Sequence, residues 1–126
     1  MSRAVAAILW TKSCHDFNAA ADLKDTDPDR VGDQVFGLLL QQSVEKAVKS
    51  LMLRKNLRYS HTHDLRKLFQ ELSRRVEIPP ELGYLDELSS FAMQERYEVP
   101  VSPYRMDRNG LLRDVRLLLD WVAENG

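Results

Sequence analysis

Apolar side chains recur every three or four positions in five segments of the 126-residue chain, which is the spacing of one buried face of an α-helix. The helices expected from this pattern span about residues 3–23, 27–53, 62–76, 82–96 and 107–122. No run alternates apolar and polar residues as a half-buried strand would. Each helix has one apolar stripe to bury and the connections are short, so the pattern predicts an all-α fold, a five-helix up-and-down antiparallel bundle.

Two of the expected stripes are used again below. The stripe of the first helix consists of Ala6, Trp10, Cys14, Phe17 and Ala21. The stripe of the second helix consists of Phe36, Leu40, Val44, Ala47, Val48 and Leu51. Each set shares one side of a helix at 100° per residue, so both sets are expected in the core.

Capping residues and prolines indicate where several helices begin and end. Asp27 followed by Pro28 is typical of a helix start, because aspartate can cap the helix and proline lacks an N–H that would be unpaired there anyway. Thr62 is expected to cap the third helix, with Asp64 in its first turn near the positive end of the dipole. The proline pair at 79–80 stops that helix, because a proline ring cannot continue the ladder.

Composition favours a single, ordinary soluble domain over residues 1–126. The net charge of -1 gives no global reason to expect nucleic acid or a membrane, although basic residues gather between 54 and 67. The single cysteine, Cys14, cannot form an internal disulfide, which favours a reducing compartment. No apolar stretch approaches the length that spans a membrane, and the apolar run at 4–10 has no convincing cleavage site for a signal peptide. We expect a cytoplasmic protein.

The second helix carries a polar arc roughly 140° wide beside its apolar stripe. This arc contains Gln41, Gln42, Glu45, Lys46 and Lys49. Because the stripe occupies the core side, the arc is expected to face solvent, a partner or a ligand. One interpretation is a solvated face stiffened by a Glu45–Lys49 pair. The other is a surface rich in hydrogen-bond donors that binds phosphate or a nucleotide base.

Few other residues suggest chemistry. Capping accounts for Thr62 and Asp64 but not for His63 between them, and a histidine at a helix start is more often a structural hydrogen-bonding group than a catalyst. Three histidines and one cysteine form no metal-ligand pattern, and there is no glycine-rich phosphate loop, so no metal or cofactor is expected. Cys14 and His15 point about 100° apart on a helix, which argues against a Cys–His nucleophile.

Two segments in this order resemble a known family. Residues 36–51 (FGLLLQQSVEKAVKSL) are similar to the FHxQQAxEKxLKAL signature of the HEPN domain (higher eukaryotes and prokaryotes nucleotide-binding domain), and residues 62–65 match its THDL. Residues 95–97 followed by Pro100 resemble the arginine-tyrosine-proline element of the family's fourth helix. Trp10 and Asp16 stand where the family has a tryptophan and an acidic residue. The resemblance extends over nearly the whole chain.

The resemblance implies a helical bundle that is usually dimeric and acts beside nucleotides or RNA, commonly with a separately encoded minimal nucleotidyltransferase. The nucleotide-binding residues expected on this basis and from the polar arc are Gln42, Lys46, Lys49, His63, Arg96 and Tyr97. Arg96 would supply a fork for phosphate and Tyr97 a ring for a base. One departure from the family pattern is Gly37, which replaces a histidine.

A homodimer is also favoured by apolar side chains beyond the expected stripes. Trp121 lies off the stripe of the fifth helix, and Tyr84, Phe91 and Met93 crowd the fourth. An apolar surplus on one face is normally hidden by a partner, so we expect a symmetric dimer.

Three functions remain open at this point. The leading hypothesis is a non-catalytic module that binds a nucleotide, RNA or a nucleotidyltransferase. The second is a metal-independent ribonuclease, because some HEPN proteins are toxins of toxin–antitoxin pairs in which four to six residues lie between an arginine and a following histidine. Arg54 with His61 and Arg58 with His63 fit this bare spacing, and Arg58 and His63 are the catalytic candidates, but both pairs precede the third helix rather than a late one. The third is an adaptor that binds only protein.

Overall fold

The computed structural model describes residues 2–94 and 106–126 of the chain. Its α-helices are α1 (Ser2–Asp22), α2 (Asp33–Arg54), α3 (Leu65–Ser73), α4 (Ser89–Gln94) and α5 (Arg108–Asn125). A 3₁₀-helix, η1 (Pro80–Leu88), precedes α4. Within the described residues there is no strand, so the prediction of an all-α, five-helix bundle is confirmed.

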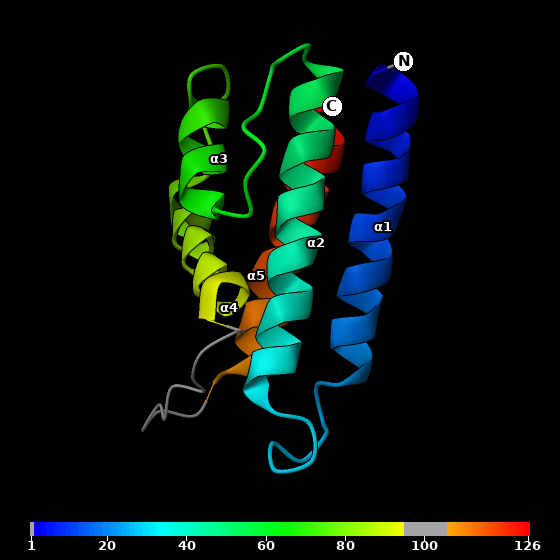
Figure 1. The fold of residues 1–126 in the computed structure, drawn as a ribbon, viewed down its shortest axis with the longest axis vertical. Coiled ribbons are helices and arrows are strands. Elements are labelled where there is room, and N and C mark those ends of the chain that lie inside the picture. Colours follow the sequence, from blue (N-terminus) through cyan, green and yellow to red (C-terminus); the bar gives the residue numbers. More distant parts are fainter. Residues whose placement is uncertain (1, 95–105) are drawn as a thin grey trace.

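Helix α2 is the centre of the bundle (Figure 1). It packs against α1, α3, η1, α4 and α5. In Figure 1, α1 and α2 run antiparallel beside each other, and both chain ends lie at the upper end of the molecule. The chain after α2 does not pass directly into α3. Residues 55–64, which we call the return segment, run back alongside α2 before α3 begins, so α3 rises in the same direction as α2 (Figure 1).

The apolar stripe expected on the second helix is the core of the structure. All six of its residues, from Phe36 to Leu51, are completely buried. The opposing side chains come from the other helices, among them Leu65, Leu68, Leu72, Leu85, Val115, Leu118 and Val122. Local periodicity therefore identified the core correctly, because burial of a stripe is the dominant favourable term in packing a helix.

Helix α1 packs through small residues, and its stripe is only partly the expected one. Ala6 and Phe17 are buried, whereas Cys14 is half-buried and Ser13 takes a core position. The Ser13 hydroxyl donates to the Ser43 carbonyl at 2.6 Å, and the Ser43 hydroxyl donates to the Ser13 carbonyl at 2.9 Å. Hydrogen-bonded serines satisfy their own polar groups, so they can occupy a helix interface that a hydrophobicity pattern assigns to apolar residues.

The second helix begins later than the Asp27-Pro28 pair suggested. The Asp27 carboxylate accepts the Asp29 N–H at 2.9 Å in a turn, and α2 starts only at Asp33. The buried Arg108 side chain explains this difference, because its guanidinium donates to the carbonyls of Leu23, Thr26 and Val31. A cation from α5 thus holds the α1–α2 connection in a non-helical form.

Two further boundaries differ from the expectation. Asp64, not Thr62, caps the third helix: its carboxylate accepts the Arg66 N–H at 3.0 Å, while Thr62 accepts the Asp64 N–H. The helix also ends at Ser73, short of Val76. The expected fourth helix is a 3₁₀-helix followed by the short α4, so its leucines are buried without a long α-helical ladder.

Two of the four apolar residues behind the dimer prediction are partly covered within the subunit. Phe91 and Trp121 are partly buried and pack against the core. Tyr84 is 42% exposed, and its hydroxyl donates to the Asp114 carboxylate. Burial, together with the Asp114 carboxylate, raises the pKa of Tyr84 to about 12. The Met93 side chain lies outside the described residues.

Among the described helices, none is long and apolar enough to cross a membrane.

Candidate functional site

The polar arc of α2 does not face solvent throughout. Gln41 is 1% exposed and Glu45 is 7% exposed, so the expectation of an outward arc is wrong for these two residues. The return segment covers them: the Gln41 side-chain amide donates to the His63 carbonyl at 3.1 Å. The sequence pattern could not reveal that Gln41 and Glu45 are buried, because the return segment that covers them has no periodicity of its own.

Glu45 is the centre of a buried hydrogen-bond network. Its carboxylate accepts from the Gln41 amide at 2.8 Å and from the Lys49 ammonium at 2.9 Å. Burial alone would raise the pKa of Glu45, but the hydrogen bonds from Lys49, Gln41 and His63 together lower it below its ordinary value. Glu45 is therefore a carboxylate at neutral pH, and the Glu45–Lys49 pair expected from the sequence is present.

His63 is oriented by that carboxylate. Its Nδ1 atom lies 2.9 Å from Oε1 and 3.1 Å from Oε2 of Glu45, while its side chain is 80% exposed. An ionised carboxylate only accepts hydrogen bonds, so Nδ1 carries the proton and donates it. The Nε2 atom belongs to the same exposed ring and does not take part in the contact with Glu45. An imidazole held in this way can donate from Nε2 to a phosphate oxygen when both ring nitrogens carry a proton, or take up a proton at Nε2 when only Nδ1 carries one.

The two lysines of the arc point to different neighbours. Lys49 is only 12% exposed, and its ammonium lies 5.2 Å from the centroid of the Tyr59 ring on the return segment. Lys46 pairs instead with Asp16 of α1, at 2.5 Å between Nζ and Oδ2. The structure thus brings Lys49 and His63 together around Glu45, whereas it places Lys46 on the side of α1.

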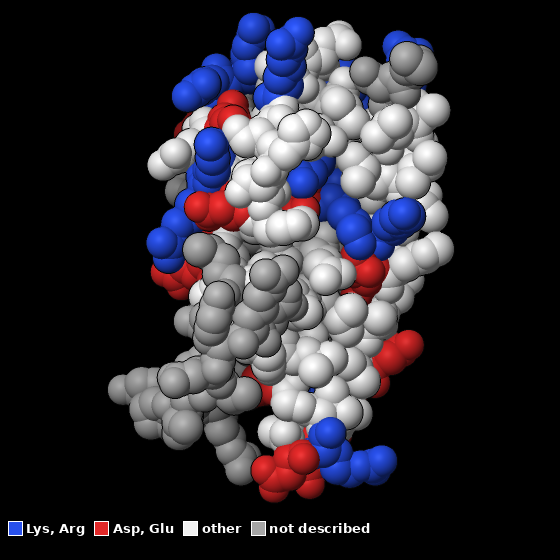
Figure 2. Space-filling model, in the orientation of Figure 1, with Lys and Arg blue, Asp and Glu red and all other residues white. Residues whose placement is uncertain are grey.

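The remaining expected residues are more scattered. Gln42 is partly exposed on α2, and Arg58 is exposed on the return segment. Arg96 and Tyr97 lie outside the described residues. Figure 2 shows lysine and arginine side chains gathered at the upper end of this face, over α3 and the C-terminal end of α2, with acidic side chains among them. We use the name His63 face for the exposed His63 ring together with Lys49, which shares Glu45 with it, and Arg58, which is exposed on the same return segment.

Sequence reasoning placed Gln41 and Glu45 in the polar arc but did not identify Glu45 as the central acceptor or Gln41 as its buried partner, and it missed Tyr59. The spacing of Gln41, Glu45 and Lys49 at four-residue steps was a usable signal, because such residues stack along one line of a helix. Tyr59 carried no signal, since its position depends on the path of the return segment.

The described residues offer little support for metal binding or for a reactive thiol. Within residues 2–94 and 106–126, no three side chains of His, Cys, Asp or Glu lie close enough to hold a metal ion. Burial raises the pKa of the Cys14 thiol more than the nearby Arg116 lowers it, which disfavours the thiolate.

Gly37, the departure from the family signature, has a structural explanation. A Cβ atom at this position would lie 2.6 Å from the ring of Phe91. The glycine therefore lets the aromatic ring of α4 lie directly on α2. Phe91 fills the space that a side chain at position 37 would need.

Comparison with protein families matches residues 9–125 to the HEPN domain. No curated protein and no solved structure gives a significant match. The matched region covers all the helices except the first turns of α1 and includes the whole His63 face. The family implies a function related to nucleotides or RNA. The chain belongs to the HEPN domain family.

Proposed function

We propose that this protein is a non-catalytic HEPN module that binds a nucleotide or RNA at the His63 face. The observation that carries the proposal is the exposed His63 ring held by the buried Glu45 carboxylate. An exposed side chain does not need a buried, ionised partner in order to fold. The buried Glu45 carboxylate also binds Gln41 and Lys49, but the orientation that it gives to the exposed His63 ring is best explained by a ligand.

The neighbouring groups suit a phosphate. Arg58 is exposed and supplies a flexible cation, and the doubly protonated His63 ring adds a directed hydrogen bond from Nε2–H. The free N–H groups at the start of α3 are less suitable, because the Asp64 carboxylate occupies that end. This supports a phosphate position beside the imidazole rather than on the helix axis.

Binding measurements with single substitutions test this proposal. A labelled single-stranded RNA and nucleotides would be titrated into the parent protein, Arg58→Ala, His63→Ala and the exposed control Arg74→Ala. Loss of one phosphate contact is expected to weaken binding at least roughly tenfold, or ~1.4 kcal/mol. Equal binding by His63→Ala and the parent would move the site elsewhere. Absence of any binding would favour the protein-binding adaptor.

A second candidate function is a metal-independent ribonuclease that acts as a toxin, favoured by the same Glu45–His63 contact. A carboxylate that holds Nδ1–H of an imidazole leaves Nε2 as a general base. Nε2 would take the proton of an RNA 2′-hydroxyl, whose oxygen then attacks the adjacent phosphorus and displaces the 5′-oxygen, which leaves with a proton from water. Arg58 would stabilise the charge on the phosphoryl oxygens.

Incubation of RNA with the protein and a chelator separates the two candidates. Cleavage that leaves 2′,3′-cyclic phosphate ends and is lost in His63→Ala would establish the enzyme. Intact RNA that nevertheless binds the protein would establish the non-catalytic module.

The proposed protein partner is a separately encoded minimal nucleotidyltransferase, on the basis of the family. Co-expression with a nucleotidyltransferase from a neighbouring gene, followed by purification through a tag on one chain, is expected to recover both. Recovery of the tagged chain alone would count against this partner.

A further inference from the structure

The return segment is attached to each of its two neighbouring helices by a carboxylate. It lies between α2 and α3 (Figure 1), and on the α2 side the Glu45 carboxylate contacts the His63 ring. On the α3 side the Glu71 carboxylate accepts the Ser60 N–H at 3.0 Å and the Ser60 hydroxyl at 2.6 Å. These two hydrogen bonds lower the pKa of Glu71 below its ordinary value, so this carboxylate is also ionised at neutral pH. The segment therefore has one polar attachment on each neighbouring helix.

Apolar burial contributes little to holding the segment in place. None of the described side chains between residues 55 and 64 is fully buried, and Leu57 and Tyr59 are only partly buried against the core. A segment with few buried apolar contacts opens at a lower free energy than packed helices do. Opening would also hydrate the Glu45 carboxylate, which is 7% exposed beneath the segment, and so remove the penalty of burying a charge. Closure therefore depends mainly on the polar attachments.

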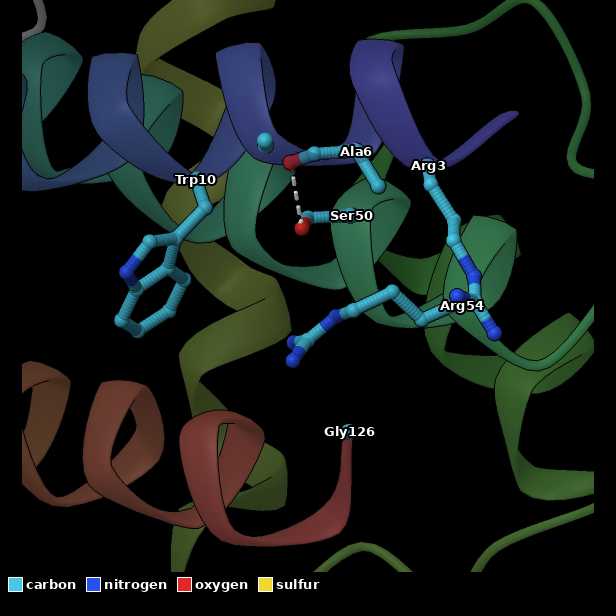
Figure 3. A pocket seen from close by; sticks show the side chains of 7 residues that line it. Arg3, Ala6, Trp10, Ser50, Arg54 and Gly126 are labelled. Atoms are coloured by element: carbon cyan, nitrogen blue, oxygen red, sulfur yellow. Dashed lines mark hydrogen bonds between the residues drawn. The ribbon is translucent and has the colours of Figure 1, made fainter. Parts of the chain in front are cut away.

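The helix ends on both sides of the segment are fixed. Figure 3 shows the side chain of Arg54, the last residue of α2, reaching into a cavity of about 430 Å³ between α1, α2 and the C-terminal end of α5. There its Nη2 group donates to the Val122 carbonyl at 3.3 Å. Asn56 follows with a φ of 56°, a left-handed conformation that asparagine adopts more readily than most residues. At the other end Asp64 caps α3. Motion would thus be confined to the residues between these two ends.

We propose that the return segment is a lid over Gln41 and Glu45 that opens locally while the helices of the bundle stay folded. The closed lid carries the exposed Arg58 and the oriented His63 ring. Its role in regulation rests on the proposed function, because a phosphate held by both Arg58 and His63 favours the closed lid. By reciprocity, a lid that stays closed binds that ligand more tightly. The lid itself depends only on the attachments at Ser60 and His63 and needs no ligand.

Native-state amide hydrogen exchange measures local opening residue by residue. Suitable reporters are the Leu57 and Asp64 amides, which are hydrogen-bonded near the two ends of the closed segment and do not bond to Glu71. Glu71→Ala removes the attachment to α3 and is expected to speed exchange at both reporters roughly tenfold, because two hydrogen bonds to a charged group are lost. The matched control is Glu77→Ala, at an exposed glutamate outside the segment, which is expected to leave both rates unchanged.

The pattern of exchange along the chain decides the outcome. Faster exchange at both reporters, with unchanged exchange in the middle of α2 and α5, would support the lid. Unchanged reporters in Glu71→Ala would overturn it, and so would equal acceleration in the helices, because the bundle would then unfold as one unit. Ser60→Ala removes one of the two hydrogen bonds and is expected to give a smaller acceleration at the same reporters. This variant carries the test if Glu71→Ala does not fold.

A ligand arm tests the coupling separately. A saturating single-stranded RNA added to the parent protein is expected to slow exchange at Leu57 and Asp64 but not in the middle of α5. RNA that binds without slowing these amides would contradict the regulatory role of the lid. Absence of RNA binding would count against the proposed function alone, since the variants measure the lid with no ligand present.

Discussion

The Nδ1 atom of His63 lies 2.9 Å from Oε1 of Glu45, although 18 positions separate the two residues in the sequence. Gln41 adds a second link between α2 and the return segment, because its side-chain amide donates both to the Glu45 carboxylate and to the His63 carbonyl. The return segment is thereby held against the middle of α2. A substitution at Glu45 should affect folding as well as function, whereas one at the exposed His63 ring should mainly affect function.

Glu45→Gln is expected to lower the free energy of unfolding at neutral pH by about 1–3 kcal/mol, because it removes the buried charge that Lys49 and His63 contact. The pKa of Glu45 is lowered on folding, so its stabilisation is complete above the ordinary value of 4.5 and is lost as the pH falls through the folded value. Urea unfolding at neutral and acidic pH measures both effects. The parent should lose more stability on acidification than the variant, and parallel losses would refute this assignment.

Gly37→Ala is expected to destabilise the protein by about 1–3 kcal/mol, because the added Cβ would overlap the Phe91 ring at 2.6 Å. Gly83→Ala is the matched control, since nothing lies within 4 Å of a Cβ at that position. Thermal unfolding of both variants makes the comparison. In a Phe91→Ala background, Gly37→Ala should destabilise the protein less than it does in the parent, as expected for two residues in contact. Equal costs at the two glycines would contradict close packing of Phe91 on α2.

Arg108→Ala is expected to lower the free energy of unfolding by about 3–5 kcal/mol. The substitution leaves the Asp33 carboxylate and several carbonyls of the α1–α2 connection without their buried partner. Arg108→Lys should recover only part of this, since an ammonium cannot reach all these acceptors as a planar fork does. The control is Arg113→Ala at a 71% exposed side chain, expected within about 0.5 kcal/mol of the parent. Denaturant unfolding of the three variants gives the values, and a small effect of Arg108→Ala would exclude the clamp.

The symmetric homodimer implied by the family stays a prediction. Phe91 and Trp121 pack against the core of their own subunit and so lend it less support than their place in the sequence suggested. Light scattering at tens of micromolar protein is expected to give twice the mass of the chain. A strictly monomeric mass at that concentration would refute the dimer.

The sequence by itself determined the all-helical class and the core side of the central helix. The stripe from Phe36 to Leu51 is completely buried, as its spacing indicated. These predictions depended only on local periodicity, because a helix with one apolar face gains free energy by burying that face in whatever bundle it joins. The signature around Glu45 and the THDL at residues 62–65 also identified the family.

Only the tertiary structure decided which polar groups meet. Asp27 lies in a turn because Arg108, from the far end of the chain, takes the carbonyls of that connection, and Glu45 is buried because the return segment runs back over it. Arg54 enters a cavity beside Trp10 for a similar reason, since α1 and α5 close around the end of α2. The partner of a charged or polar side chain depends on the path of distant segments, and desolvation makes that partner decisive for its orientation and charge.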